Sequence, residues 1–85
     1  MRILHLIRNI GDERALDTAE TQQGQGHQVT LLLLHDAVLE GVRFDGEVLA
    51  CQDDVRARTG RTRLKTVDYD QIVRMLFEHD RVVSW

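Results

Sequence analysis

Three short apolar runs constrain the fold of this chain more than any other feature of its sequence. They span Ile3–Ile7, Val29–Leu34 and Glu47–Cys51, and each is five or six residues long. Polar residues or glycines bound them. Short runs that are apolar at consecutive positions are typical of strands buried on both faces, which occur in parallel sheets covered by helices. The runs therefore predict an α/β fold.

The segments between these runs have helical patterns. The clearest is Tyr69–His79, where Asp68 is placed as the N-cap and Gln71 completes a capping-box variant. Its predicted apolar face comprises Tyr69, Ile72, Val73 and Leu76. The other predicted helices are Asp12–Gln23, a short helix after Asp36 and one opening at Gln52–Asp54. Two further strands are predicted, Leu64–Val67 and Arg81–Trp85. The alternation predicts a single domain, residues 1–85, built as a three-layer α/β/α sandwich with a five-stranded, mainly parallel sheet.

The cysteine content indicates a compartment. One cysteine excludes an intramolecular disulfide and fits a reducing environment, so we expect the cytoplasm. The run Ile3–Ile7 is too short for a signal sequence or a membrane span, and no membrane association is expected. A net charge of −3 argues against a general nucleic-acid binder.

Polar residues follow several of the predicted strands. The strand ends are Arg8–Asn9, His35–Asp36, Cys51–Gln52 and Asp68. Ligands of open α/β sheets collect beyond the carboxyl ends of the strands. The sequence therefore predicts that these polar and reactive side chains converge on one edge of the sheet.

Cys51 has two interpretations, a reactive thiol or an inert packing residue. It ends a strand and precedes a helix N-terminus, which favours a thiolate. The helix dipole contributes only about 0.3–1 kcal/mol, less than the ~1.36 kcal/mol of one pKa unit. Asp53 and Asp54 oppose ionisation, so activation requires a cation such as Arg58 or a protonated His35.

The histidines divide in the same way. His35 with Asp36 resembles an oriented imidazole; in the alternative, Asp36 caps the next helix and His35 is partly buried. His5 lies within a strand and is predicted to be a core or near-surface residue. The four histidines have no HxH or HxxxH spacing, so no metal site is predicted. The Gly24–Gly26 turn precedes a strand instead of opening a helix, so no phosphate loop and no cofactor are expected.

One basic run stands out, and it comprises Arg56, Arg58, Arg61, Arg63 and Lys65. It is either a solvated face or a docking surface for an acidic protein partner or RNA phosphates, with Arg61 and Arg63 as the contact residues. Phe44 is either an exposed aromatic of an interface or a residue that folds back over the core.

Three stretches together resemble a known family. They are "LLLLHDAVLEG" (Leu31–Gly41), "VLACQDDVRARTG" (Val48–Gly60) and "VDYDQIVRMLFEHDRVVSW" (Val67–Trp85). With the opening "ILHLIRN", they resemble the DsrE/DsrF/DsrH-like family over nearly the whole chain. The similarity is closest to the DsrH/TusB branch.

The resemblance implies a function in sulfur transfer. Family members are subunits of complexes that pass persulfide sulfur toward 2-thiouridine at the tRNA wobble position, or that act in sulfur oxidation. In DsrE- and TusD-like subunits the sulfur-carrying cysteine follows the third strand, and Cys51 matches that place. TusB-like chains commonly have an aliphatic residue there, so this sequence departs from the branch it most resembles.

Three functional hypotheses follow. In the first, Cys51 carries sulfur within a sulfur-relay complex, His35 and Asp36 line the site, and Arg58 favours the anion. In the second, the chain is a non-catalytic assembly subunit that binds DsrE/DsrF-like or TusC/TusD-like partners. Its expected contact residues are Val38, Leu39, Phe44 and Met75. In the third, it binds a small anion or a nucleotide at the same edge. We expect a homo-oligomer when the chain is isolated and a hetero-oligomer in the cell.

Overall fold

The computed structural model describes all residues from 1 to 85 and contains every predicted strand and helix. The elements are β1 (Arg2–Ile7), α1 (Glu13–Gly24), β2 (Gln28–Leu33), the 3-10 helix η1 (His35–Leu39), β3 (Glu47–Cys51), α2 (Gln52–Arg58), β4 (Lys65–Val67), α3 (Tyr69–Glu78) and β5 (Arg81–Ser84). The longest helix, α1, has 12 residues, and none of the helices combines the length and the apolar character that a bilayer crossing requires.

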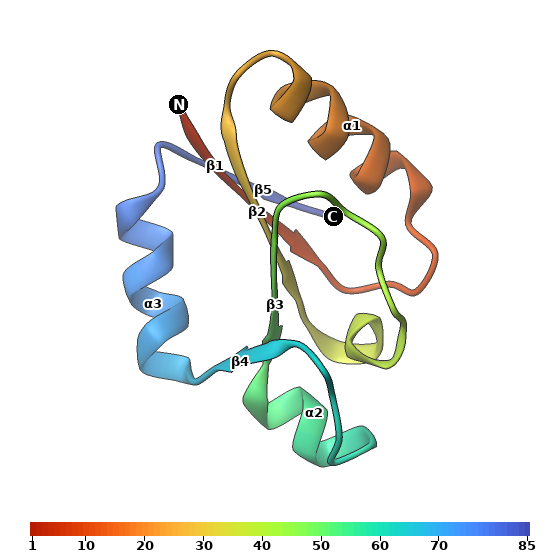
Figure 1. The fold of residues 1–85 in the computed structure, drawn as a ribbon. Coiled ribbons are helices and arrows are strands. Elements are labelled where there is room, and N and C mark those ends of the chain that lie inside the picture. Colours follow the sequence, from red (N-terminus) through yellow and green to blue (C-terminus); the bar gives the residue numbers. More distant parts are fainter.

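The five strands form one parallel sheet in the order β4-β3-β2-β1-β5 (Figure 1). The chain moves outward from β1 to β4 and then returns past the whole sheet to place β5 beside β1. Crossover connections between parallel strands are right-handed, so a return in the opposite direction places its helix on the opposite face. Accordingly, α1 and α3 lie on opposite sides of the sheet, which confirms the predicted α/β/α sandwich.

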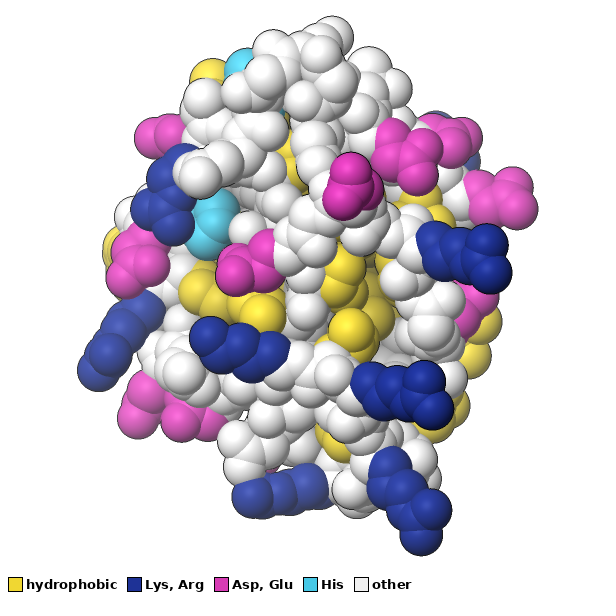
Figure 2. Space-filling model, in the orientation of Figure 1, with side chains coloured by type: hydrophobic (Ala, Val, Ile, Leu, Met, Phe, Trp, Pro, Cys, Tyr) yellow, Lys and Arg dark blue, Asp and Glu magenta, His cyan; other side chains and the backbone are white.

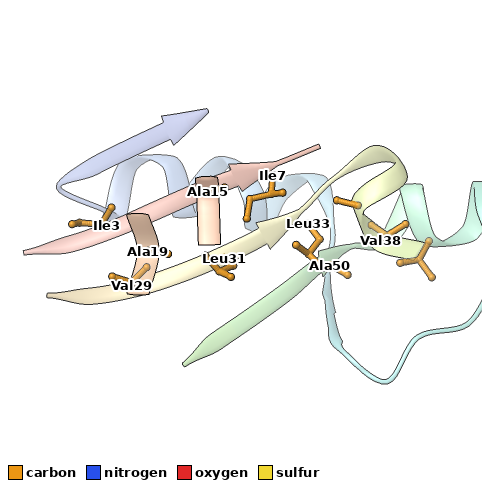
Figure 3. Packing of buried hydrophobic residues seen from close by; sticks show 11 residues of the cluster. Ile3, Ile7, Ala15, Ala19, Val29, Leu31, Leu33, Val38 and Ala50 are labelled. Atoms are coloured by element: carbon orange, nitrogen blue, oxygen red, sulfur yellow. The ribbon is translucent and has the colours of Figure 1, made fainter. Parts of the chain in front are cut away.

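The main hydrophobic core lies between the sheet and α1. Its strand residues alternate along β1 and β2, and its helix residues are the small Ala15 and Ala19, both fully buried. Small side chains let a helix approach a sheet closely, and Ala15 and Ala19 are the only buried residues of α1. Figure 3 shows this cluster along β1 and β2 as far as Val38 in η1.

The opposite face carries a smaller core under α3. Leu4, Leu32, Leu49 and Val67 are buried there, and Ile72 and Met75 of α3 pack against them.

The predicted face of α3 is partly wrong. Ile72 packs on the sheet as expected, but Tyr69 has 72% of its surface exposed and Leu76 has 39%. The capping box is confirmed, because Asp68 Oδ1 accepts from Gln71 N at 2.8 Å and Gln71 Oε1 accepts from Asp68 N at 2.9 Å. With that start, Ile72 and Met75, three residues apart, share the side facing the sheet.

His5 is a fully buried core residue, as predicted. The Trp85 indole Nε1–H donates to His5 Nδ1 at 2.8 Å, and the two rings stack with centroids 6.0 Å apart. An indole nitrogen only donates, so Nδ1 is the acceptor and the proton resides on Nε2. That proton faces the Gln22 Oε1 atom at 2.6 Å. The network joins β1, α1 and the C-terminal residue.

Candidate functional site

The predicted convergence at the carboxyl edge of the sheet is present only in part, and Asp54 is its centre. Arg8 instead donates to the Trp85 carbonyl at 3.1 Å, and Asp68 caps α3. The Asp54 Oδ2 atom accepts a hydrogen bond from the backbone N–H of His35 at 2.8 Å. Its Oδ1 atom lies 3.5 Å from Arg58 Nη1, one turn further along α2. One carboxylate therefore connects the end of β2 with the helix that follows β3.

Arg58 bridges two carboxylates. Its Nε donates to Asp36 Oδ1 at 2.9 Å while Nη1 reaches Asp54, and only 19% of the Arg58 side-chain surface is exposed. The other oxygen of Asp36 lies 3.6 Å from the Nδ1 atom of His35. The pKa of Asp36 is lowered below its ordinary value of 3.8, mainly by the hydrogen bond from Arg58. The positive charges of His35 and Arg58 add to this effect.

His35 adopts an uncommon backbone conformation. Its φ of 53° lies in the left-handed region, where glycine and, less often, asparagine, aspartate and histidine are found. This turn directs the backbone N–H toward Asp54 and leaves the imidazole in solvent, with 63% of the side chain exposed.

The alternative interpretation of the pair His35–Asp36 was wrong. Leu34 occupies the N-cap position of η1 without a side-chain cap, Asp36 lies within the first turn, and His35 is exposed instead of partly buried. The left-handed turn at His35 ends the strand, so the side-chain alternation of a strand does not extend beyond Leu34.

Cys51 occupies the N-cap position of α2 and is partly buried. The pKa of the Cys51 thiol is raised above the ordinary value of 9.0, mainly because the thiol is partly buried. The negative charge of the Asp54 carboxylate acts in the same direction. The backbone of Asp53 and Asp54 at the start of α2 acts in the opposite direction and lowers the pKa of the thiol. The net direction is upward, so neither Arg58 nor the helix start makes the thiolate the favoured form in the isolated chain.

The remaining predicted contact residues are dispersed. Arg61 and Arg63 are exposed in the loop between α2 and β4 and form no ion pair. Phe44 is partly buried against the main core, so it folds back and is not a freely exposed interface aromatic. Its ring lies over Gly46, where an added Cβ would stand 2.7 Å from Phe44 Cε2.

Two of the other three expected contact residues face inward. Val38 is buried in the main core and Met75 packs on the second core, whereas Leu39 is half exposed. The exposed apolar residues of α3 and β5 were missed, and they are Tyr69, Leu76, Phe77 and Val82.

Asp54 was named from the sequence only as a charge that opposes ionisation of Cys51. Its spacing to Arg58, four residues on a helix, is a signal for an ion pair and would have identified it as a site residue. No group of three or more His, Cys, Asp or Glu side chains is arranged to hold a metal ion.

Fold and site together define a small parallel α/β domain with a thiol and a connected set of charged groups at the carboxyl edge of its sheet. Neither a protein-family model nor a curated protein matches the chain.

Proposed function

We propose that this chain is a cytoplasmic subunit of a sulfur-relay complex of the DsrE/DsrF/DsrH kind, in which Cys51 accepts sulfane sulfur as a persulfide. The observation that supports this most is the position of the thiol. It lies at the carboxyl end of β3, where ligands of open α/β sheets bind, beside the only linked network of charged side chains.

The transfer requires a thiolate and a persulfide donor, and no other reactant. The Cys51 sulfur attacks the terminal sulfur of the donor, a new S–S bond forms, and the S–S bond of the donor breaks. The donor leaves as a thiolate and takes up the proton that Cys51 gave up, so no net oxidation occurs. The sulfur then passes on by the same exchange, toward wobble-uridine thiolation of tRNA or toward sulfur oxidation.

The raised pKa of Cys51 predicts how the site is controlled. In the isolated chain the thiol is mostly protonated near neutral pH, so loading is slow and becomes faster as the pH rises. A partner subunit that supplies a cation next to Asp54 would lower the pKa of Cys51 and accelerate the transfer.

Mass spectrometry tests the proposal. The native chain is incubated with a small persulfide donor, and we expect one added sulfur atom on Cys51 and none in the Cys51→Ser variant. Asp54→Asn is the matched variant: its amide oxygen still accepts from His35 N, but the negative charge is gone. We expect it to load faster at the same pH. A thiol that reacts with donors and alkylating agents only after denaturation, alone and with its partners, excludes the carrier role.

The second candidate is a non-catalytic assembly subunit that binds TusC- or TusD-like chains. The raised pKa of the thiol favours it, and so does the apolar surface on α3, where Phe77 has 87% of its surface exposed. Purification from the native host distinguishes the two: both predict homologous companions, but only the carrier predicts that Cys51→Ser abolishes sulfur transfer while the complex remains intact.

A further inference from the structure

A groove lies on the same side of the molecule as η1 but apart from Cys51. It runs between two loops, the one that leaves η1 and the one that joins α2 to β4, and it has a volume of about 260 Å³. Its apolar lining consists of Val38, Leu39, Val42 and Leu64. Leu39 is half exposed, at 50%, although its neighbours Ala37 and Val38 are buried in the main core.

Two guanidinium groups line the same groove. Arg61 and Arg63 come from the α2–β4 loop, and both are exposed and without an ion pair. The one acidic residue of the lining, Glu40, is engaged elsewhere, since its Oε2 accepts from Gly11 N at 2.6 Å. The groove thus combines an apolar floor with unpaired positive charge.

The positive charge of the groove is opposite in sign to the net charge of the protein. The protein has a net charge of −3, yet the charged side chains visible at the lowest end of the molecule in Figure 2 are dark blue. Local charge of the sign opposite to the net charge selects partners of complementary charge and steers their association.

We propose that this groove binds an extended acidic segment of a partner protein, one in which an apolar side chain is flanked by carboxylates. The apolar side chain contacts Leu39 and Leu64, and the carboxylates pair with Arg61 and Arg63. The inference is independent of the role of Cys51, which lies outside the lining.

RNA fits this surface less well than an acidic peptide. No aromatic side chain lines the groove, so bases have no platform on which to stack, and the apolar floor offers nothing to a phosphate backbone.

Fluorescence polarisation with labelled octapeptides tests the proposal. The probe has glutamates on both sides of a central leucine pair; its comparators replace the leucines by serine or the glutamates by lysine, and a 12-nucleotide single-stranded RNA is added as a fourth ligand. We expect the acidic leucine peptide to bind most tightly, with affinity that falls as NaCl is raised. Arg61→Glu with Arg63→Glu should weaken its binding by about tenfold or more. Leu39→Ser should weaken it without loss of fold.

The matched control is Arg14→Glu with Arg81→Glu, which changes the net charge equally at exposed cations outside the groove. It should leave the affinity nearly unchanged. Equal loss in both double variants, tighter binding of the RNA or of the lysine peptide, or no binding of any peptide would overturn the proposal. So would self-association of the unliganded chain that disappears in the Arg61/Arg63 variant, because the partner would then be a second copy.

Discussion

Replacing Trp85 by phenylalanine should destabilise the fold through the buried histidine that the indole contacts. His5 is fully buried, and the Trp85 N–H is the donor to its Nδ1 atom at 2.8 Å. Phenylalanine retains a ring for stacking but has no donor. The variant therefore leaves a buried acceptor unsatisfied, which costs about 1–3 kcal/mol of the free energy of unfolding.

The cost translates into a measurable shift of the melting temperature. For a domain of this size each kcal/mol corresponds to about 4–8 °C in Tm. Trp85 is the only tryptophan of the chain, so the variant is followed by circular dichroism in heat and urea instead of by fluorescence. A decrease in the urea midpoint with an unchanged slope would assign the effect to stability alone.

A double-mutant cycle with His5→Phe isolates the hydrogen bond from the loss of ring area. The double variant has neither the donor nor the buried acceptor, so it should be less destabilised than the sum of the single variants, by about 0.5–3 kcal/mol. The reduced ring area is lost in both arms and cancels. If the two single effects add within about 0.5 kcal/mol, the bond between Trp85 and His5 contributes nothing and the reasoning is wrong.

Three further predictions concern the edge of the sheet and α3. Arg58→Gln should raise the pKa of Asp36 back toward its ordinary value, as measured by NMR titration of the carboxyl. Because the pKa is lowered in the folded state, the stability from this pair is present above the pKa of the unfolded chain. It is lost as the pH falls through the pKa of the folded protein. An unchanged titration would show that the ion pair does not form in solution. His35→Val should have a free energy of unfolding about 1–2 kcal/mol lower than that of His35→Gly, because valine tolerates the left-handed backbone poorly. Equal urea midpoints of the two variants would contradict that conformation. Phe77→Ser should reduce self-association in sedimentation equilibrium without lowering Tm, since the ring is 87% exposed, whereas unchanged association would place the homo-oligomer contact elsewhere.

The fold was predictable because the decisive signals are local. The run Glu47–Cys51 is a strand with the predicted bounds, and the Asp68–Gln71 capping box is present atom for atom. Apolar runs of five residues have few alternatives once glycines and polar residues bound them. The three-layer arrangement then follows from the handedness of the connections.

The site was less predictable because it depends on how loops and helices meet. The sequence indicated that His35, Asp36, Cys51 and Arg58 gather at one edge, but the choice of partner for Arg58 is a matter of geometry. The Arg58 guanidinium pairs with the carboxylates of Asp36 and Asp54 and not with the thiol. The burial of Cys51, which raises its pKa, could not be predicted from residue spacing.

The surface of α3 illustrates a different limit. A helical pattern identifies which residues share a side, but a helix covering only part of a sheet leaves some apolar side chains in solvent. Phe77 is one of them. Whether such a residue packs inward depends on the phase of the helix, which the cap fixes, and on how much of the sheet the helix spans.

The pairing of β5 with β1 has a consequence for how this chain folds. Arg2 and Asp80 meet across a sequence separation of 78 residues, and the outer side of β1 has no neighbour until that contact forms. Such non-local closure raises the contact order and slows folding. On the ribosome, where synthesis proceeds at about 5–20 residues per second, β5 begins about 1–3 s after β4 is complete. During that interval the six-residue strand β1 presents an unpaired edge with apolar side chains, the kind of template on which nascent chains aggregate.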